Sequence, residues 1–366
     1  MNWKFFYKIL SFIDPELSHD IVVNIIKTGL FFKIKTRSTP LKVMNLKFKN
    51  PIGLAAGFDK NALLMSEIDK LGFAFSEVGT VTVFPQKGNP KPRIFRLPED
   101  EAVINRNGFN NDGLEVIKHR IASFRKSLKS SSIKLGINIG PNKNSVDRIK
   151  DYNKLVNELS KYADYLAINI SSPNTPNLRE LQLHKNFKNL IISIKKEISK
   201  QINKPPILVK ISPDLSEKEI FKIIKVIMQE KLQGLIISNT TLNRNVKSIY
   251  EKEVGGLSGK PLFELSTKVV IKARKFLKDH DSDISIIAAG GVDDGKSAYI
   301  KILCGADLVQ LYTGMIYKGP FVVKNILKEL DEYKKRDKIK KWSDVRGEAD
   351  SLKKAYKIVK YGLNKK

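Results

Sequence analysis

The chain has 366 residues, of which 42% are hydrophobic, and its formal net charge at neutral pH is +28. This length allows one large domain with an appendage, or two domains, and the apolar content excludes a wholly disordered chain. The single cysteine excludes a disulfide framework and favours a reducing compartment. The 66 basic residues are spread along the chain, so their excess over the 38 acidic ones reflects either a general lysine bias or an affinity for anionic membrane or nucleic acid.

The first 40 residues carry an unusual aromatic load. Residues 3–13 and 18–32 each show the pattern of a short amphipathic helix, and the turn between them contains Asp14-Pro15. Such a pair cannot bury all of its apolar surface by itself, so it either packs on the main domain or lies on a membrane surface with lysines at the rim. We expect no transmembrane span and no cleaved signal sequence, because no apolar run is long enough and Asp14-Pro15 interrupts the segment.

Residues 41–335 alternate short apolar runs with stretches of helical period. The runs, mostly β-branched or glycine-bearing, number eight: Pro51–Gly57, Phe73–Gly79, Ile133–Ile139, Tyr165–Ile170, Ile207–Ile211, Gly234–Ser238, Ile284–Ala289 and Leu308–Tyr312. The helical stretches include residues 147–161, 185–200, 216–231, 263–279 and 293–303. Eight strand–helix units predict an α/β fold, a closed (β/α)8 TIM barrel that follows the N-terminal amphipathic helix pair. The alternative, an open doubly wound sheet, is disfavoured because no Gly-x-Gly-x-x-Gly follows the first strand.

Two further segments do not fit a strand–helix unit. Residues 80–111, rich in proline and glycine, form a long insertion after the second strand, and such insertions usually serve the active site. Residues 336–366 are rich in lysine with a weak helical pattern, and we expect a solvated C-terminal helix without chemistry. The chain thus divides into an N-terminal helical segment (1–40), a barrel (41–335) and a basic C-terminal extension (336–366).

Every predicted strand ends in polar residues or glycines, whereas the strand starts do not. The ends are Ala55–Lys60, Val78–Thr80, Asn138–Gly140, Asn169–Asn174, Lys210–Ser212, Ser238–Thr241, Ala289–Gly291 and Tyr312–Gly314. In a TIM barrel the C-terminal strand ends form the rim at which catalysis is assembled. We therefore expect the active site there, and we expect no metal in it because no His, Cys, Asp or Glu cluster has the spacing of metal ligands.

The last two strand ends predict a phosphate site. Gly290-Gly291 and Thr313-Gly314 offer backbone N–H groups that few side chains obstruct, and barrels often bind phosphate after strands seven and eight. The segment Gly255–Gly259 is a third glycine-rich loop nearby.

Two lysines follow the first and fifth strands. Burying Lys60 or Lys210 there is costly unless an anion is close. One could pair with a substrate carboxylate, and the other could stabilise a cofactor that becomes negative on reduction. For Lys60 the alternative is an ion pair with the adjacent Asp59.

Ser172 could be a nucleophile or a base. A nucleophilic serine needs a general base, and none of the histidines lies at a predicted strand end, so no Ser-His-Asp arrangement is visible: His19, His119, His184 and His280. A serine base is weak and requires a dry site and a relay, for which Thr175 and a water are plausible partners. The structural alternative is a simple turn.

At these residues the sequence resembles the quinone-dependent, membrane-associated class 2 dihydroorotate dehydrogenases. The likeness runs from about residue 1 to residue 332 and rests on Gly53–Lys60, Asn105–Asn111, Asn169–Asn177, Ser238–Thr241 and Gly255–Pro261. Class 1 members place a cysteine where Ser172 stands and lack the N-terminal helix pair, whereas Cys304 here lies in a predicted helix. Phe58 and Asn107 depart from residues common in relatives, and the tail after about residue 335 lacks the usual family ending.

The resemblance implies one FMN per chain, lined by Ala56, Gly57, Phe58, Asp59, Lys60, Thr80, Asn138, Asn169, Lys210, Ser238, Gly259, Gly291, Tyr312 and Thr313. It implies a site for dihydroorotate or orotate made of Lys60, Asn105, Arg106, Asn107, Gly108, Phe109, Asn169, Asn174, Asn239 and Thr240. It also implies a quinone pocket near His19, Arg96 and Tyr312.

The implied reaction oxidises (S)-dihydroorotate to orotate in de novo pyrimidine (UMP) biosynthesis, with Ser172 as base, FMN as hydride acceptor and a membrane quinone as final acceptor. Lys210 would stabilise the reduced flavin, and residues 105–109 would lie under a lid. We expect a monomer or weak homo-oligomer, peripheral on the cytoplasmic face of a bacterial inner membrane and in contact with anionic lipid. The alternatives are another flavin barrel dehydrogenase, acting on a dihydropyrimidine or dihydrouridine, and a basic nucleic-acid-binding protein, which would leave the strand-end pattern unexplained.

Overall fold

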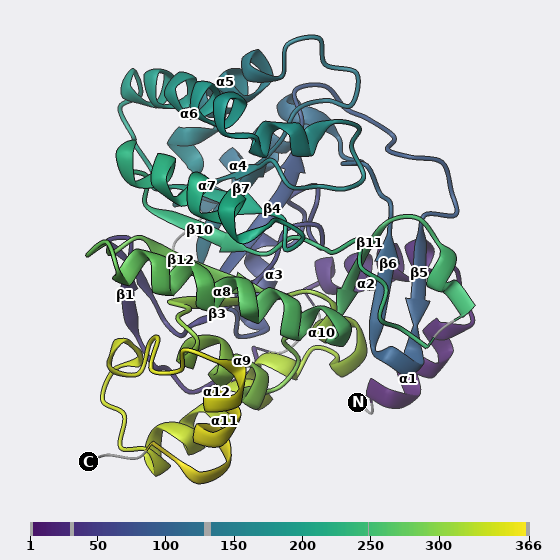
Figure 1. Cartoon of the computed structure of the whole chain (residues 1–366). Coiled ribbons are helices and arrows are strands. Elements are labelled where there is room, and N and C mark those ends of the chain that lie inside the picture. Colours follow the sequence, from purple (N-terminus) through teal and green to yellow (C-terminus); the bar gives the residue numbers. More distant parts are fainter. Residues whose placement is uncertain (1–2, 30–32, 128–132, 248, 364–366) are drawn as a thin grey trace.

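A closed parallel barrel forms the body of the protein in the computed structural model, which describes residues 3–29, 33–127, 133–247 and 249–363. Within those residues the barrel strands run in chain order around the barrel, and the last pairs with the first (Figure 1): β3 (Ile52–Leu54), β4 (Phe75–Val81), β7 (Lys134–Ile139), β8 (Tyr165–Asn169), β9 (Ile207–Ile211), β10 (Gly234–Ile237), β12 (Ser285–Ala289) and β13 (Leu308–Leu311). All eight predicted strands are present, so the predicted TIM barrel is confirmed.

Helices cover the outside of the barrel: α3 (Met65–Lys70), α4 (Gly113–Ser127), α5 (Arg148–Leu159), α6 (His184–Ser199), α7 (Glu217–Gln229), α8 (Phe263–Lys278), α9 (Gly295–Leu303) and α11 (Val322–Arg336). The short helix α10 (Thr313–Lys318) lies at the C-terminal rim, in contact with α1 and β11. Helix α7 shows why these segments are helical. Its buried isoleucines recur three and four residues apart, and a capping box between Ser216 and Glu219 satisfies its first backbone donors. The predicted helical stretches overlap α5, α6, α7, α8 and α9.

A short hairpin that the sequence analysis did not predict closes the N-terminal end of the barrel. It joins β1 (Leu41–Val43) to β2 (Leu46–Phe48) through Met44 and Asn45, both of which have positive φ. Hairpin turns of this kind usually contain glycine, so the residues of this turn do not indicate a hairpin. Phe48 packs edge-on against Phe75 of β4 at 5.4 Å between ring centroids. This end of the barrel is therefore filled by side chains, and the opposite end is available for a site.

The insertion after β4 forms a small antiparallel sheet at the C-terminal rim. Its strands β5 (Ile94–Leu97) and β6 (Ala102–Asn105) pair with each other, and β6 also pairs with β11 (Gly256–Gly259), which comes from the loop after β10. In Figure 1 the three strands stand beside α1 and α2. The expected long insertion at the active-site end is thus an ordered sheet.

The predicted N-terminal helix pair is confirmed as α1 (Trp3–Ser11) and α2 (Pro15–Lys27). Asp14 caps α2 by accepting hydrogen bonds from the backbone N–H groups of Glu16 and Leu17, both at 3.0 Å. The second helix starts earlier than the predicted residue 18, and part of its predicted end, residues 30–32, lies outside the described residues. Among the described residues, no helix is long and apolar enough to cross a bilayer.

The pair packs on the main domain and also exposes apolar side chains. Helix α1 contacts α10, and α2 contacts β5. Several apolar side chains of the two helices and of the turn between them are 37–84% exposed: Phe5, Ile9, Phe12, Leu17 and Ile25. Packing on the main domain is therefore observed, and the membrane-surface interpretation of the exposed apolar side chains stays a prediction.

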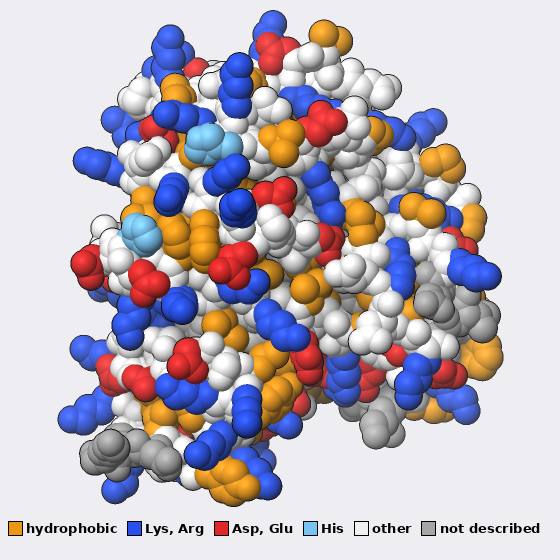
Figure 2. Space-filling view, viewed as in Figure 1, with side chains coloured by type: hydrophobic (Ala, Val, Ile, Leu, Met, Phe, Trp, Pro, Cys, Tyr) orange, Lys and Arg blue, Asp and Glu red, His pale blue; other side chains and the backbone are white. Residues whose placement is uncertain are grey.

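Basic side chains are spread over the face of the molecule shown in Figure 2, interspersed with acidic ones rather than gathered into one patch. This distribution favours the lysine-bias interpretation of the +28 charge for that face.

The expectation of a solvated C-terminal helix is wrong for most of the segment after α11. The last helix of the segment contacts α9 and α8, and six side chains along the segment are buried: Ile339, Trp342, Val345, Ala349, Ala355 and Ile358. Of these, only the last two belong to α12 (Leu352–Tyr361), which lies beside α9 in Figure 1. Arg346 reaches the buried carboxylate of Asp307, which also accepts from Arg274 at 2.7 Å. The apolar residues of this segment are widely spaced among lysines, so the sequence did not indicate that they are buried.

Replacing Trp342 should test how much the extension contributes to stability. The side chain is 5% exposed and packs near Tyr299, with 6.2 Å between ring centroids. We expect Trp342→Ala to lower the free energy of unfolding by about 3–5 kcal/mol through the cavity it leaves. Urea unfolding measures this, with Tyr361→Ala as the control because Tyr361 is 67% exposed. Equal losses in both variants would contradict the buried role of the extension.

Candidate active site

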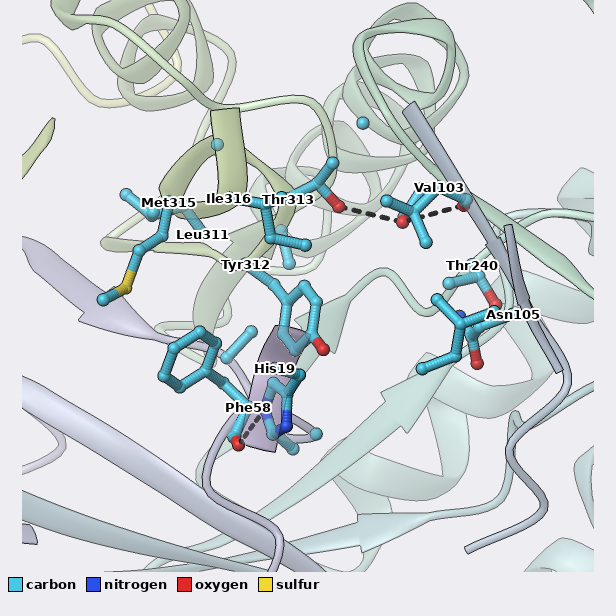
Figure 3. A pocket seen from close by; sticks show the side chains of 18 of the residues that line it. His19, Phe58, Val103, Asn105, Thr240, Leu311, Tyr312, Thr313, Met315 and Ile316 are labelled. Carbon is cyan, nitrogen blue, oxygen red and sulfur yellow. Dashed lines mark hydrogen bonds between the residues drawn. The ribbon is translucent and has the colours of Figure 1, made fainter. Parts of the chain in front are cut away.

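A cavity of about 340 Å³ opens at the C-terminal ends of the barrel strands. Its walls come from the strand ends, from the insertion sheet and from the N-terminal helix pair. Figure 3 shows the rings of His19, Phe58 and Tyr312 gathered on one side, and Asn105 and Thr240 on another. The rim predicted from the strand ends is therefore hollow and accessible to a ligand.

Most of the predicted site residues line this one cavity. They come from segments far apart in the sequence: His19, Ala56, Gly57, Phe58, Lys60, Thr80, Arg96, Asn105, Asn107, Gly108, Phe109, Asn169, Ser172, Asn174, Lys210, Ser238, Asn239, Thr240, Gly259, Gly291, Tyr312 and Thr313. Three predicted residues, Asp59, Arg106 and Asn138, do not line it.

Asp59 has a structural role. Its buried carboxylate accepts hydrogen bonds from the backbone N–H groups of Leu63 at 2.7 Å and Leu64 at 2.9 Å. Burial raises the pKa of Asp59, although these two bonds oppose the rise. The carboxylate thus fixes the turn after β3, and among the described residues it forms no ion pair with Lys60. The alternative interpretation of Lys60 is therefore not observed.

Arg106 and Asn138 lie just outside the cavity. The Arg106 guanidinium points to the edge of the insertion, where it pairs with Glu253 at 2.6 Å and donates to the carbonyl of Pro92 at 2.8 Å. Asn138 lies beneath the floor, accepting from the Thr80 hydroxyl at 2.6 Å. Their contacts with a ligand would be indirect, through the residues they hold.

Amide and hydroxyl groups form the floor as a connected network. The Asn169 amide donates to the Thr80 hydroxyl at 3.0 Å and to Asn138 at 3.2 Å, and Asn239 donates to the Ser171 hydroxyl at 2.9 Å. Because these buried groups satisfy one another, their positions are fixed before a ligand binds.

A buried carboxylate that the sequence analysis missed lies below Lys210. Glu77, in β4, is fully buried and its Oε1 lies 3.6 Å from the Lys210 ammonium. Glu77 also accepts hydrogen bonds from Asn138 at 2.7 Å and Gln310 at 2.9 Å. A charged residue within the apolar run Phe73–Gly79 was the available signal. The ion pair fixes the position of the Lys210 side chain at the cavity wall.

The other lysine, Lys60, lines the cavity without a carboxylate partner. No Asp or Glu oxygen among the described residues lies within 4.0 Å of its ammonium. Burial lowers the pKa of Lys60, and the more distant Glu16 opposes that shift. A cation placed in this way is electrostatically complementary to an anionic ligand.

Ser172 is 5% exposed and lines the cavity, and its hydroxyl accepts a hydrogen bond from the backbone N–H of Asn174 at 3.2 Å. Among the described residues it makes no hydrogen bond to a histidine. His19, which comes from α2 rather than a strand end, bonds the carbonyl of Phe58 at 2.9 Å instead. Thr175 is also buried, and its hydroxyl has no hydrogen-bond partner in the described part of the chain. The arrangement provides no nucleophile–base pair but leaves a hydroxyl available for a relay.

The loops after β12 and β13 fit a phosphate group. Gly290 and Gly291 have positive φ values of 106° and 73°, and a Cβ on Gly291 would lie 2.4 Å from that of Phe263. Likewise, a Cβ on Gly259 would lie 2.3 Å from the carbonyl oxygen of Glu101. Only glycine allows these backbones to approach so closely, and their N–H groups border the cavity.

An apolar arm of the same cavity runs between the N-terminal helices and α10. Its walls include Trp3, Phe6, Tyr7, Leu10, Val22, Ile25, Ile26, Met315, Ile316 and Tyr317. The Tyr312 ring lies edge-on to Phe58, and Phe58 lies edge-on to His19, with centroid separations of 5.7 and 5.3 Å. Arg96 donates to the backbone carbonyls of Leu10 and Ile13, and so ties α1 to the insertion sheet.

A buried ion pair connects α2 to the loop that leads into β5. The carboxylate of Glu16 accepts two hydrogen bonds from Arg93, at 2.5 and 3.0 Å. Arg93 in turn donates to the carbonyl of Asn89 at 2.8 Å, and the Asn89 amide donates to the carbonyl of Asn174 at 3.1 Å. This chain of contacts runs from α2 to the Ser172 loop, and no local sequence pattern indicated it.

The fold and this cavity together define a TIM-barrel enzyme with a phosphate cradle, a polar chamber and an apolar access arm. A family model described as dihydroorotate dehydrogenase matches residues 38–333. The chain belongs to the dihydroorotate dehydrogenase family. Within it, the chain falls with the quinone-dependent, class 2 members, as the sequence resemblance predicted.

Similar proteins come from bacteria and eukaryotes. The dihydroorotate dehydrogenase (quinone) of Bartonella tribocorum is 47% identical, over 92% of this chain and 94% of its own length. The mitochondrial one of Mus musculus is 44% identical, over 87% and 82%. A crystal structure of the Eimeria tenella protein in complex with ferulenol has a TM-score of 0.88 and 39% identity, covering 92% of this chain and 96% of its own.

Proposed function

We propose that this chain oxidises (S)-dihydroorotate to orotate in de novo pyrimidine biosynthesis, with FMN as hydride acceptor and a membrane quinone as final electron acceptor. The observation that carries the proposal is the continuity of the cavity: a polar chamber with Ser172, Lys60 and Lys210 opens into an apolar arm between α1, α2 and α10. Such a cavity can hold an anionic substrate at one end and a hydrophobic one at the other.

The residues present fit FMN. The glycines of the cradle would admit its phosphate, and the wall of Ala56, Thr80 and Asn169 would face its ring system. When bound, FMN supplies a hydride acceptor whose reduced form carries negative charge. Lys210, whose side chain Glu77 holds in place, would stabilise that charge without having to move.

For the substrate, Lys60 would pair with the carboxylate, and Asn105, Asn174 and Asn239 would hydrogen-bond the ring amides. Ser172 would remove a proton from the carbon next to the ring carbonyl, within a chamber from which water is largely excluded. Because a neutral serine is a weak base, the proton must pass onward, and the unpartnered Thr175 hydroxyl would serve that relay with a water.

The membrane role rests on the N-terminal segment, residues 1–40. Its exposed apolar side chains would enter the headgroup region, and neighbouring lysines would contact anionic lipid. Quinone would then reach the cavity through the apolar arm, near His19, Arg96 and Tyr312. We propose a peripheral location on the cytoplasmic face of a bacterial inner membrane, as a monomer or weak homo-oligomer, and no role in binding nucleic acid.

The decisive experiment measures reduction of a quinone analogue by purified protein with dihydroorotate, beside fumarate and NAD as alternative acceptors. We expect turnover with the quinone analogue alone. A yellow protein that fails with dihydroorotate but reduces the acceptor with another dihydropyrimidine or with dihydrouridine would overturn the proposed substrate.

Removal of Lys60 should weaken binding of the product. In the described part of the chain the Lys60 ammonium has no carboxylate partner. Lys60→Ala therefore removes the proposed ionic contact with the orotate carboxylate and breaks no ion pair within the protein. We expect a loss of about 1.5–3 kcal/mol, or roughly 10- to 100-fold in affinity. Titration of the flavin absorbance with orotate measures it. Lys87→Ala, at an exposed lysine of the insertion, is the control, and unchanged affinity in Lys60→Ala would contradict the assigned contact.

A further inference from the structure

Lys301 of α9 is a wholly buried lysine outside the cavity and has no carboxylate partner. Its ammonium donates to the Ser266 hydroxyl at 2.6 Å and lies 3.4 Å from the carbonyl of Phe263. No Asp or Glu oxygen in the described part of the chain lies within 4.0 Å of it. The nearby thiol of Cys304 is neutral, because burial raises its pKa to about 12. A buried ammonium without an anion is costly, so its presence requires an explanation.

The position of Lys301 makes that cost larger. Phe263 is the first residue of α8, a 16-residue helix, and its ring, whose centre lies 5.0 Å from the ammonium, makes a cation–π contact that offsets only part of the cost. The N-terminus of a helix carries partial positive charge, so a lysine there is disfavoured unless an anion is close. Burial lowers the pKa of Lys301 to about 7, because the charged form loses its hydration in the protein interior.

The contacts of Lys301 lead directly to the phosphate cradle. The Ser266 hydroxyl that receives its hydrogen bond lies 3.2 Å from the carbonyl oxygen of Gly290. On the other side, the backbone of Phe263 touches Gly291 so closely that a Cβ there would lie 2.7 Å from the Phe263 Cα. Gly290 and Gly291 both line the cavity, whereas Lys301 does not. The ammonium therefore lies one residue layer behind the loop that would bind a phosphate.

We propose that Lys301 is a positioning residue for the cofactor phosphate, whose negative charge is the missing counter-charge for its buried ammonium. The inference rests on the proposed function, because it assumes that the cradle holds the phosphate of FMN. The lysine does not touch the phosphate. It acts through the field of its charge and through its hydrogen bond to Ser266, whose hydroxyl lies within 3.2 Å of the carbonyl oxygens of Leu262, Phe263 and Gly290 and so links the start of α8 to the glycine loop. A purely structural lysine would instead stabilise the fold equally with or without a phosphate.

The test compares FMN with riboflavin, which has the same ring system and no phosphate. Apoprotein is titrated with each flavin, and quenching of flavin fluorescence gives two dissociation constants and their ratio. Lys301→Met removes the charge and keeps an apolar chain of similar length, whereas Lys301→Gln also keeps a hydrogen-bond donor for Ser266. Lys296→Met, at an exposed lysine of the same helix, is the matched control.

We expect the preference of the wild-type protein for FMN over riboflavin to fall at least about tenfold in both Lys301 variants, and to stay unchanged in Lys296→Met. Using the ratio within each variant cancels any general loss of stability, and the glutamine variant provides the measurement if the methionine variant does not fold. If both flavins lose affinity in proportion, or neither does, Lys301 only packs the loop and the inference is overturned. A wild-type apoprotein that binds neither flavin would instead contradict the proposed function.

Discussion

Flavin reduction by dihydroorotate should fall by about two to four orders of magnitude in Ser172→Ala, the range that general-base catalysis supplies. The hydroxyl is almost buried, lines the cavity and receives one hydrogen bond, from the Asn174 backbone. Alanine removes the proton acceptor and leaves a space no larger than one oxygen atom. We therefore expect FMN content and orotate affinity to stay within about twofold of wild type, since the residues assigned to those contacts keep their side chains and only the backbone N–H of Asn174 loses its acceptor.

Stopped-flow absorbance of the bound flavin measures this half-reaction without any quinone. Thr175→Val is the companion variant, because it removes the hydroxyl proposed for the relay and preserves the shape of the side chain. A smaller but clear decrease in the same step is expected there. Near-normal flavin reduction in Ser172→Ala would remove Ser172 from its role, and the structural alternative, a turn residue, would stand.

The barrel was predictable because each strand has two recognisable features in the sequence. A run such as Ile207–Ile211 is continuously apolar, as a strand buried on both faces must be, and it then ends in polar residues at the rim. The hairpin formed by β1 and β2 carries neither feature: its strands have three residues each, and its turn contains no glycine. Local sequence patterns therefore identify the barrel strands, which all share the same buried environment. They do not identify the hairpin, which occurs once and closes one end of the barrel.

The site divides in the same way. Residues at strand ends, such as Lys60 and Ser172, were found because the fold class fixes where strand ends meet. Asp59 has the same location in the sequence, yet its carboxylate turns inward to bond its own loop. Glu77 and the Glu16–Arg93 pair were missed because their importance lies in a tertiary partner that no local pattern reveals. Sequence position predicts which residues reach the rim, whereas side-chain direction depends on competing partners.

Loss of the N-terminal helix pair should separate the two half-reactions. Deleting residues 1–38 removes α1 and α2, which supply one wall of the apolar arm. We expect quinone turnover to fall by about two orders of magnitude, as for a reactant that loses the surface positioning it. Binding to vesicles that contain anionic lipid should be lost as well, because the exposed apolar side chains go with the helices. Steady-state assays and vesicle sedimentation measure the two losses.

The deletion also has a predictable effect on the other half-reaction. It leaves Arg93 without Glu16, the carboxylate that holds its guanidinium in place. Since Arg93 also holds Asn89, which bonds the Asn174 carbonyl, some loss of dihydroorotate binding should follow. Glu16→Gln isolates this contribution, because the helices remain and only the ion pair is weakened. In that variant the KM for dihydroorotate should rise while quinone turnover at saturating substrate is kept.

Val22→Trp provides the complementary change. Val22 belongs to α2 and lines the apolar arm, and it lies away from the Glu16–Arg93 pair in sequence. A larger side chain there should obstruct the arm, so the quinone half-reaction should slow while flavin reduction by dihydroorotate stays near wild type. If quinone turnover survives both the deletion and the obstruction, electrons leave the flavin by another route. The continuity of polar chamber and apolar arm would then have no part in catalysis, and the quinone assignment would lose its structural basis.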